Sequence, residues 1–196
     1  MAFLVEFLRH PRRTGALLPS SPSAVRALLD GALLDGAEHV VELGPGTGAV
    51  TAELSRRLSG RARLVAVEVN PLFAERLRQR FSADQVDVVC DSAARLDRIV
   101  AGRGFGKVDR VISGLPWTVM SPATQREILE AVTNCLAPDG RFSTLMYLHR
   151  TRSRAAREFV ALLREYFTTV ERGPTTWTNL PPLLAYHCSG PRRGQR

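Results

Sequence analysis

This sequence of 196 residues lacks long apolar runs and has few lysines and cysteines. It has no stretch of about eighteen apolar residues, so we expect no segment to span a membrane. The amino terminus has no basic leader ahead of a long apolar core, so we also expect no secretory signal. Lys107 is the only lysine, and arginine therefore supplies almost all of the formal net charge of +8.

The placement of the few cysteines argues against cross-links and metal ligands. Cys90, Cys135 and Cys188 are odd in number and widely spaced, with two in predicted strands and one in a predicted helix. We expect buried free thiols rather than disulfide partners or zinc ligands. The sequence therefore predicts a cytoplasmic protein without a metal site.

The chain does have enough apolar side chains for a full core. At this length, a hydrophobic content of 44% predicts a single domain over residues 1–196. The positive charge indicates an acidic partner such as nucleic acid, anionic lipid or a phosphorylated substrate. Because arginine enrichment also follows from a GC-rich genome, the positions of the arginines are more informative than their total.

The stretch from Val40 to Gly48 is the most informative part of the sequence. It reads Val-Val-Glu-Leu-Gly-Pro-Gly-Thr-Gly, which predicts a buried strand, a glycine-rich turn and a helix that begins near Ala49. Alternate glycines leave out side chains where a ligand would meet Cβ, and the start of a helix directs N–H groups toward polar or anionic groups. Glu42 lies at the carboxyl end of the strand, so we predict a nucleotide-like site.

Three further predicted strands, which end at about residues 67, 90 and 112, lead directly into Glu68, Asp91 and Ser113. Glu68 follows the glycines by about twenty residues, a spacing at which a carboxylate can accept both hydroxyls of a ribose. The carboxyl ends of parallel strands meet at one edge of a sheet, so we expect these groups to converge. Acidic strand ends that coincide by chance are the alternative interpretation, and it requires four coincidences.

Strands and helices alternate along the rest of the chain. Apolar periodicity predicts further strands at 141–148, 168–171 and 183–188. It predicts helices at 3–8, 22–33, 49–58, 71–81, 92–100 and 122–136, and from the arginine-rich segment after residue 148 to about residue 166. Ser21 is the expected N-cap of the second helix, and a turn at 138–140 is expected to separate the helix at 122–136 from the next strand. This alternation predicts a parallel sheet with helices on both faces, and residues 190–196 are expected to form a flexible tail.

The pattern E-x-G-x-G-x-G from Glu42 to Gly48, with the acidic strand ends, resembles the class I S-adenosylmethionine-dependent methyltransferases. The resemblance implies a Rossmann-like α/β sandwich of three layers, with a seven-stranded, mostly parallel sheet, one antiparallel strand and additional N-terminal helices. It implies S-adenosylmethionine as cofactor and S-adenosylhomocysteine as product, with Glu42 at the methionine part, Glu68 at the ribose and Asp91 at the adenine. The cofactor-binding residues implied are Thr14, Ser20, Glu42, Gly44, Gly46, Thr47, Gly48, Glu68, Val69, Asp91, Ser92, Ala93 and Ser113.

The residues after the fourth predicted strand bear on the methyl acceptor. Amino-methyltransferases of nucleic acids carry Asn or Asp, then two residues including Pro, then an aromatic ring that stacks on a flipped base. The corresponding stretch from Ser113 to Trp117 reads Ser-Gly-Leu-Pro-Trp, with no amide or carboxylate in the acceptor-holding place. The extra helical domain of ribosomal RNA adenine dimethylases is also missing, so we do not expect a nucleic-acid substrate.

Four segments together resemble the small bacterial phospholipid N-methyltransferases, similar to phosphatidylethanolamine N-methyltransferase. They are R-H-P-R-R-T-G-A-L-L-P-S-S at residues 9–21, the glycine turn, S-G-L-P at 113–116 and T-N-L-P-P at 178–182. The resemblance implies stepwise methylation of phosphatidylethanolamine by a monomer at the inner face of the cell membrane. Residues 1–13 would bind anionic lipid through an amphipathic helix, within an N-terminal region (1–34) whose loop covers the cofactor; a simple lid is the alternative for that helix.

Aromatic and basic residues near the expected opening suit a headgroup that carries an amine and a phosphate. We expect Tyr147 and the Ser113 and Gly114 carbonyls to orient the amine, Trp117 to contact it by a cation–π interaction, and Tyr147 or His149 to help remove its proton. The residues expected to bind phosphate are Arg13, Arg150 and Arg152. Core packing of the aromatic rings and a solvated arginine face are the alternatives. An RNA adenine enzyme, a small-metabolite methyltransferase and a non-catalytic binding module also remain open.

Overall fold

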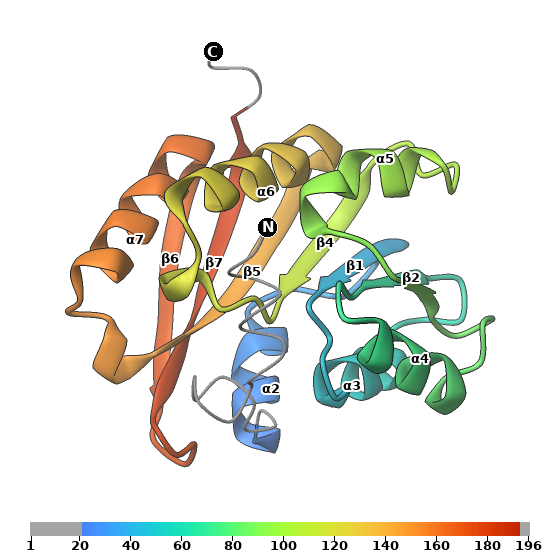
Figure 1. Cartoon of the computed structure of the whole chain (residues 1–196), viewed down its shortest axis with the longest axis horizontal. Coiled ribbons are helices and arrows are strands. Elements are labelled where there is room, and N and C mark those ends of the chain that lie inside the picture. Colours follow the sequence, from blue (N-terminus) through green and yellow to red (C-terminus); the bar gives the residue numbers. More distant parts are fainter. Residues whose placement is uncertain (1–20, 193–196) are drawn as a thin grey trace.

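The computed structural model describes residues 21–192 and contains a seven-stranded sheet with the order β3-β2-β1-β4-β5-β7-β6 (Figure 1). Strands β1 to β5 are mutually parallel where they pair, and β7 is antiparallel to both of its neighbours, β5 and β6. The strands are β1 (His39–Leu43), β2 (Arg63–Val67), β3 (Asp87–Val89), β4 (Val108–Ser113), β5 (Leu136–Tyr147), β6 (Phe167–Thr176) and β7 (Leu183–Pro191). The predicted fold class is confirmed.

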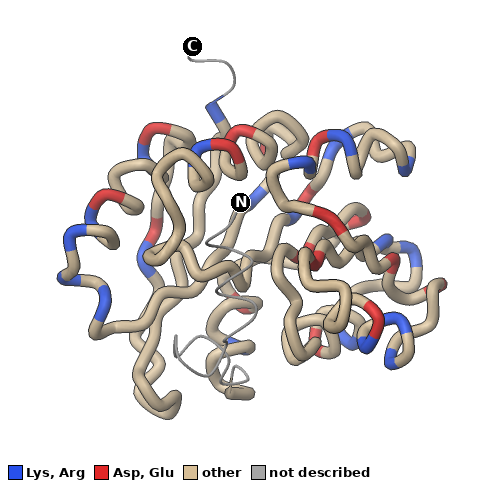
Figure 2. Tube along the Cα trace, in the orientation of Figure 1, with Lys and Arg blue, Asp and Glu red and all other residues tan. Residues whose placement is uncertain are grey.

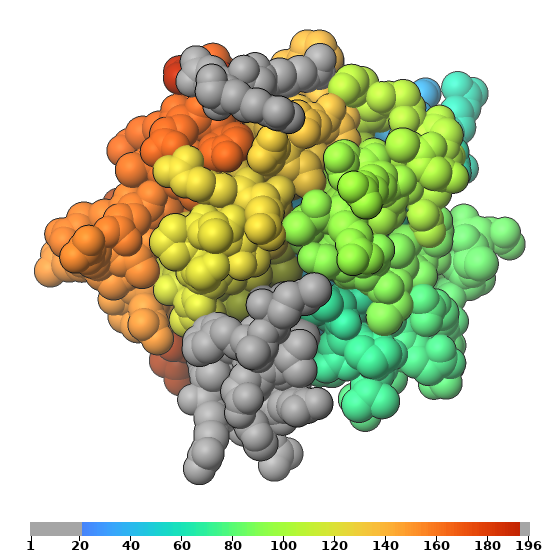
Figure 3. All heavy atoms as spheres, turned by 45° about the horizontal axis from the view of Figure 1, so that its top comes forward, coloured from blue at the N-terminus to red at the C-terminus, as the bar shows by residue number. Residues whose placement is uncertain are grey.

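Helices cover both faces of the sheet. One layer contains α2 (Pro22–Asp30), α3 (Ala49–Arg57) and α4 (Pro71–Arg80), and the other contains α5 (Leu96–Ala101), α6 (Pro122–Cys135) and α7 (Arg154–Tyr166). Figure 3 shows α5, α6 and α7 side by side on one face of the molecule. Three short 3-10 helices, η2 (Ala93–Arg95), η3 (Trp117–Val119) and η4 (Leu148–Arg150), follow β3, β4 and β5.

The sheet has two apolar faces because its central strands alternate their side chains between the two helix layers. Val41 and Leu43 pack with α5, α6 and α7, whereas Val40 packs with α2, α3 and α4. Strands buried on both faces read as continuous apolar runs, which is why the sequence shows them so clearly. Ser21 caps α2 by accepting a hydrogen bond from Ala24 N at 3.2 Å, as the sequence predicts.

Three strand boundaries differ from the expectations, and α2 ends at Asp30, before the expected residue 33. Strand β5 begins at Leu136, which pairs with Val108, so the expected turn at 138–140 is a bulge inside the strand rather than its start. Strand β6 continues to Thr176 because its partner β7 pairs with it over nearly its whole length. Strand β7 runs to Pro191, opposite Phe167, so residues 190 and 191 belong to the sheet and not to a tail.

The cysteine prediction holds for two of the three residues. Cys135 and Cys188 are buried free thiols, and burial raises the pKa of each to about 12. Cys90 is a free thiol too, but it is exposed because it lies just past the end of β3. None of the helices in the described part of the chain is long and apolar enough to cross a bilayer.

Candidate functional site

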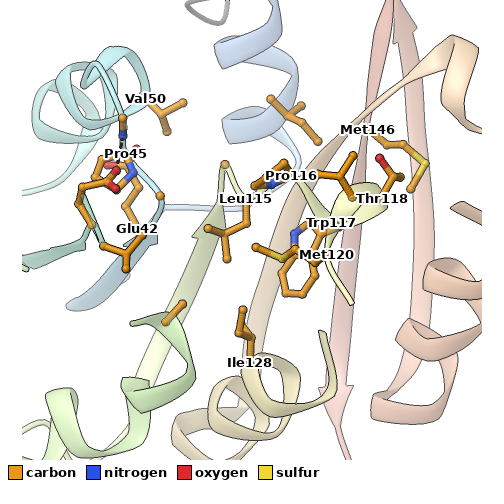
Figure 4. A pocket seen from close by; sticks show the side chains of 18 of the residues that line it. Glu42, Pro45, Val50, Leu115, Pro116, Trp117, Thr118, Met120, Ile128 and Met146 are labelled. Carbon is orange, nitrogen blue, oxygen red and sulfur yellow. Dashed lines mark hydrogen bonds between the residues drawn. The ribbon is translucent and has the colours of Figure 1, made fainter. Parts of the chain in front are cut away.

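A cavity of about 430 Å³ opens at the carboxyl edge of the parallel strands. Figure 4 shows Glu42 and Pro45 on one side of it and Leu115, Trp117 and Met120 on the other. The predicted site residues that line the cavity are Glu42, Gly44, Gly46, Thr47, Glu68, Val69, Asp91, Ser92, Ala93, Gly114, Trp117, Tyr147, His149 and Arg150. The topology therefore brings together side chains that are more than one hundred positions apart in the sequence.

Six predicted residues are not among those that line the cavity. Arg13, Thr14 and Ser20 lie outside the residues that the structure describes. Gly48, Ser113 and Arg152 are described and do not line the cavity.

The three glycines of the turn all have positive φ, but they serve different purposes. Gly46 (φ 54°) has open space where a Cβ would be and lines the cavity. Gly44 (φ 71°) approaches Leu115, and Gly48 (φ 81°) is the N-cap of α3 and lies against Leu77 of α4. Of the three glycines, only Gly46 thus offers a bare peptide group with free space in front of it, whereas the missing side chain of Gly48 lets α3 and α4 pack closely.

Glu42 is the most unusual charged residue of the site. Its side chain is 2% exposed, and its Oε2 atom has no hydrogen-bond partner among the described residues. Burial raises the pKa of Glu42 to about 8, the nearby Thr51 hydroxyl offsets part of that rise, and the charge of Glu68 adds to it. The Thr51 hydroxyl itself makes no hydrogen bond of ordinary geometry within the described part of the chain. A buried carboxyl with an unused oxygen in a cavity wall is suited to a cationic ligand group.

Glu68, at the end of β2, fixes the glycine turn and also lines the cavity. Its Oε2 accepts a hydrogen bond from Gly46 N at 3.0 Å, and its Oε1 accepts one from Asn70 N at 2.9 Å. Burial raises the pKa of Glu68, and these backbone donors partly offset the rise. A carboxylate oxygen can accept more than one hydrogen bond, so Glu68 has acceptor capacity for a ligand hydroxyl in the cavity that it lines.

Asp91 follows β3 on the same edge of the sheet. Its Oδ1 accepts hydrogen bonds from Ser92 N at 2.7 Å and from Arg95 Nη1 at 3.2 Å. The Ser92 hydroxyl caps η2 by accepting a hydrogen bond from Ala94 N at 3.3 Å. Asp91 is therefore oriented by local contacts through its Oδ1, and the residue lines the cavity.

Ser113, at the end of β4, does not have the place in the cavity that was expected for contacts with the cofactor and the amine. This residue is fully buried; its hydroxyl accepts a hydrogen bond from Trp117 Nε1 at 3.1 Å and its carbonyl accepts one from Thr144 Oγ1 at 3.2 Å. Gly114 does line the cavity, and a Cβ on it would lie 2.8 Å from the carbonyl oxygen of Gly44. Ser113 therefore holds Trp117, and the missing side chain of Gly114 lets two loops approach each other.

Trp117 lies between the cavity and the core. It is 2% exposed, its ring stacks on Phe159 with centroids 4.8 Å apart, and it meets Phe142 edge-on at 5.9 Å. Gln125 donates a hydrogen bond to the Trp117 carbonyl at 2.6 Å. The indole is therefore fixed as an apolar wall, and little of its surface is open to a flat ligand.

Tyr147 and His149 lie at the end of β5, where their rings stack with centroids 5.8 Å apart. Burial raises the pKa of Tyr147, so its phenolate is disfavoured at neutral pH. Tyr147 is thus better suited to orient an amine by its neutral hydroxyl or ring face than to remove a proton. Arg150 joins them in the wall, whereas the exposed Arg152 does not.

Sequence reasoning missed most of the apolar part of the cavity. The apolar wall residues that were not predicted are Pro45, Ala49, Val50, Val67, Phe73, Leu115, Pro116, Val119, Met120, Ile128, Leu145, Met146, Pro181 and Leu183, and the polar ones are Thr118, Thr124 and Asn179. Apolar residues in helices and strands look like ordinary core in a sequence, so periodicity cannot identify them. Asn179 and Pro181 had a usable signal, because their uncharged T-N-L-P-P segment interrupts the strand pattern.

The residues present fit a bound adenosine carrying a cationic amino-acid arm. Glu42 offers an unpaired oxygen, Gly46 offers free space beside its backbone, and Glu68 and Asp91 have acceptor capacity on the same wall. Among residues 21–192, no group of three or more His, Cys, Asp or Glu side chains could hold a metal ion.

Comparisons with known proteins agree with this chemistry. The family model described as "Methyltransferase domain" matches residues 40–140. An ornithine lipid N-methyltransferase of Singulisphaera acidiphila is 33% identical over 189 residues, which cover 96% of this chain and 94% of that protein. A ribosomal RNA small subunit methyltransferase A of Acidobacterium capsulatum is 29% identical over 85% of this chain, but this chain spans only 50% of that protein.

A solved structure shares the fold at low sequence identity. The O-methyltransferase from Bacillus cereus, in complex with S-adenosylhomocysteine, superposes with a TM-score of 0.71 at 16% identity, covering 96% of this chain and 91% of that one.

Proposed function

The chain belongs to the S-adenosylmethionine-dependent methyltransferases, and we propose that its acceptor is the amine of a membrane-lipid headgroup. The observation that carries the proposal is the shape of the site. One cavity has a polar wall of strand ends and a second, apolar wall that includes Trp117, Met120 and Ile128. A membrane lipid has a headgroup amine and apolar acyl chains. The polar wall would accommodate the first, and the apolar wall would accommodate the start of the second.

The similarity to a lipid N-methyltransferase over nearly the full length of both chains supports the same acceptor class. The buried indole of Trp117 argues against an adenine acceptor, because base stacking needs an open ring face. The finer proposal is that phosphatidylethanolamine and its mono- and dimethylated forms are substrates. The exposed Arg150, at the cavity wall, supports it, since a guanidinium pairs well with a lipid phosphate.

S-adenosylmethionine supplies an activated methyl group on a sulfonium when it is bound. Glu42 would hold the amino-acid arm, Glu68 the ribose and Asp91 the adenine, which leaves the apolar wall for the acceptor. Gly114 and Tyr147 would orient the amine, and the surrounding apolar side chains would exclude water from it. His149 is the candidate to accept the proton that the amine loses, since the pKa of Tyr147 is raised.

We further propose that the protein works as a monomer in the cytoplasm and binds the inner face of the cell membrane. Residues 1–13, which lie outside the described part of the chain, are proposed to contribute an amphipathic anchor. The positive net charge supports attraction to an anionic leaflet.

Methyl-labelled S-adenosylmethionine tests the acceptor directly. Purified protein is offered four substrates in parallel: phosphatidylethanolamine vesicles, ornithine-lipid vesicles, vesicles without any amine, and ribosomal RNA. We expect label in one or both amino lipids and none in the amine-free vesicles. Label in RNA alone would overturn the lipid acceptor, and label in ornithine lipid alone would overturn only the phosphatidylethanolamine assignment.

The Arg150→Gln variant refines the same assay on detergent-dispersed lipids, where partitioning onto a membrane does not contribute, and Arg152→Gln, which does not line the cavity, is the matched control. If Arg150 pairs with a phosphate, its loss should raise KM for phosphatidylethanolamine by roughly tenfold, the size of one charge-assisted hydrogen bond. KM for the phosphorus-free ornithine lipid should not change. An equal effect on both lipids, or an equal effect of both variants, contradicts a phosphate contact at Arg150.

A further inference from the structure

The hairpin that connects β6 to β7 ends in an exposed, uncharged tip, residues 177–182, which we call the hairpin tip. Leu180 is 86% exposed, the highest value among the large apolar residues of the described chain, and Trp177 is 71% exposed, as is Leu72 on α4. No Asp, Glu, Lys or Arg occurs between Arg172 and Arg192. Figure 1 shows this hairpin projecting at the bottom of the molecule, and Figure 2 shows that its tip carries no charge.

The hairpin tip is held in place by the rest of the protein. Asn179 is 7% exposed, accepts a hydrogen bond from Ser21 N at 3.3 Å and donates one to the Pro181 carbonyl at 2.6 Å. Thr178 donates a hydrogen bond to the Ser23 hydroxyl at 2.7 Å. The fold thus holds two apolar side chains in water, where they do not contribute to the stability of the protein. Apolar side chains exposed together in this way are typical of an interaction surface.

The hairpin tip also borders the mouth of the cavity. Strand β6 runs parallel to β5, so the tip lies at the same edge of the sheet as the methyl-transfer site. Asn179 and Pro181 line the cavity, and Leu148 N donates a hydrogen bond to the Pro182 carbonyl at 2.8 Å, which joins the tip to η4. Arg150 and the exposed Arg152 follow directly from that junction.

From this arrangement we infer that the hairpin tip inserts Trp177 and Leu180 into the interface of an anionic bilayer and so turns the cavity mouth toward the lipid headgroups. The inference rests on the proposed lipid acceptor. Tryptophan favours the boundary between headgroups and acyl chains, and an uncharged tip avoids the cost of moving ions into it. Arginines beside the tip would meet lipid phosphates at the depth where the tip stops.

Binding to phosphatidylglycerol vesicles tests the inference without methyl transfer, because that lipid has no amine. The double variant Trp177→Ser, Leu180→Ser is compared with Leu72→Ser, which changes a 71% exposed leucine on α4. We expect the double variant to partition at least roughly tenfold more weakly, and the control to partition like the wild type. Equal partitioning of all three proteins, or equal losses in both variants, would overturn the inference.

Tryptophan fluorescence locates the tip itself. The chain has two tryptophans, and Trp117 is buried, so Trp177 should account for any change on adding vesicles. We expect a blue shift and quenching by brominated lipid in the wild type, and neither in Trp177→Phe. Absence of both in the wild type would overturn the inference, and would be the result if another segment of the chain covered the tip.

Activity on detergent-dispersed amino lipid separates this inference from the proposed function. If both are right, the double variant should methylate dispersed lipid at nearly the wild-type rate but lose activity on vesicles. If the wild type binds vesicles through Trp177 but methylates no lipid in either form, the proposed function fails while the membrane contact stands. If vesicle activity survives in the double variant, the membrane contact fails while the lipid acceptor stands.

Discussion

At the scale of single residues, Glu42 is expected to oppose folding. Its pKa is raised from 4.5 to about 8 by burial, so ionising the carboxyl costs more in the folded than in the unfolded chain. A raised folded-state pKa gives a contribution to stability that is fully present below pH 4.5 and is lost as pH rises through 8.

Glu42→Gln should therefore raise the free energy of unfolding of the ligand-free protein, by on the order of 4 kcal/mol near pH 8. The gain should shrink to almost nothing well below pH 4.5, since the wild-type carboxyl is then neutral in both states. Guanidinium unfolding at several pH values measures it, and Glu75→Gln, at an exposed site on α4, controls for a general charge effect. A gain that does not depend on pH would mean that Glu42 is not a buried ionisable group.

The same carboxyl should make cofactor binding release a proton. With a pKa of about 8, Glu42 is mostly neutral at pH 7 in the free protein, and a cationic amino-acid arm beside it would favour the ionised form. Calorimetric titration with S-adenosylhomocysteine, in buffers of different ionisation enthalpy, should show release approaching one proton at pH 7, and tighter binding at pH 8 than at pH 6. Glu42→Gln should abolish the release; an unchanged release would assign the proton to another group.

The variants Gly46→Ala and Gly114→Ala should differ in their effects: the first should mainly weaken ligand binding, and the second should mainly lower the stability of the fold. Gly46→Ala places a methyl group in the open cavity at φ 54°, so we expect a loss of only about 1 kcal/mol in stability but at least roughly tenfold weaker binding of S-adenosylhomocysteine. Gly114→Ala places its Cβ 2.8 Å from the backbone oxygen of Gly44, so it should cost about 1–3 kcal/mol of stability. The reverse ranking in unfolding experiments would contradict these assigned surroundings.

At the scale of elements, His187 joins α2 to the antiparallel part of the sheet. Its Nδ1 lies 2.9 Å from the Ser143 hydroxyl on β5, and a Cβ on Gly31, just after α2, would lie 2.1 Å from its Nε2. Burial lowers the pKa of His187 from 6.5 to about 4; Arg141 lowers it further and Glu171 opposes the change.

Stability should therefore fall as pH decreases from about 6.5 toward 4, because the unfolded chain takes up the proton first. The loss attributable to this group should reach about 3 kcal/mol. His187→Asn keeps a polar side chain and does not titrate, so its unfolding free energy should vary less over that range. If the unfolding free energies of the two proteins change in parallel with pH, His187 is not the cause of the loss. Glu42 makes the protein more stable as pH falls, but it does so in both proteins, so its contribution cancels in the comparison.

The elements that the sequence predicts best are those whose structure is determined by residues close together in the sequence. The buried strand from Val40, the glycine turn and the capping residue Ser21 follow from neighbouring residues alone, and the structure has them where the pattern predicts. The direction of a side chain at a strand end depends on the conformation of the next loop, which the local sequence does not determine. Ser113 was therefore expected in the cavity, but it lies in the core. The β5 bulge and the exposed Cys90 depend on pairing partners and strand length, so no local pattern indicates them.

At the scale of the whole molecule, the net charge of +8 and its distribution make different predictions about membrane binding. Figure 2 shows positive segments on several elements, including η4 and the start of α7. Of these, η4 carries Arg150, which lines the cavity. If the total charge attracts the protein to an anionic surface, every exposed arginine should contribute alike. If the mouth faces the bilayer, arginines beside it should contribute most, because the attraction decays over about 10 Å at ordinary ionic strength.

Two double variants, each of which removes two positive charges, distinguish attraction by the total charge from attraction by the arginines near the cavity. Arg152→Gln with Arg157→Gln changes exposed residues at the η4–α7 end, and Arg61→Gln with Arg76→Gln changes exposed residues near β2 and on α4. Partitioning onto phosphatidylglycerol vesicles is measured between about 50 and 300 mM salt, over which we expect roughly tenfold weakening for the wild type. The first variant should flatten that salt dependence more than the second, since its charges lie closer to the surface. Equal flattening would show that the molecule approaches the membrane through its overall charge, with no preferred face, and would leave the apolar hairpin tip as the sole source of orientation.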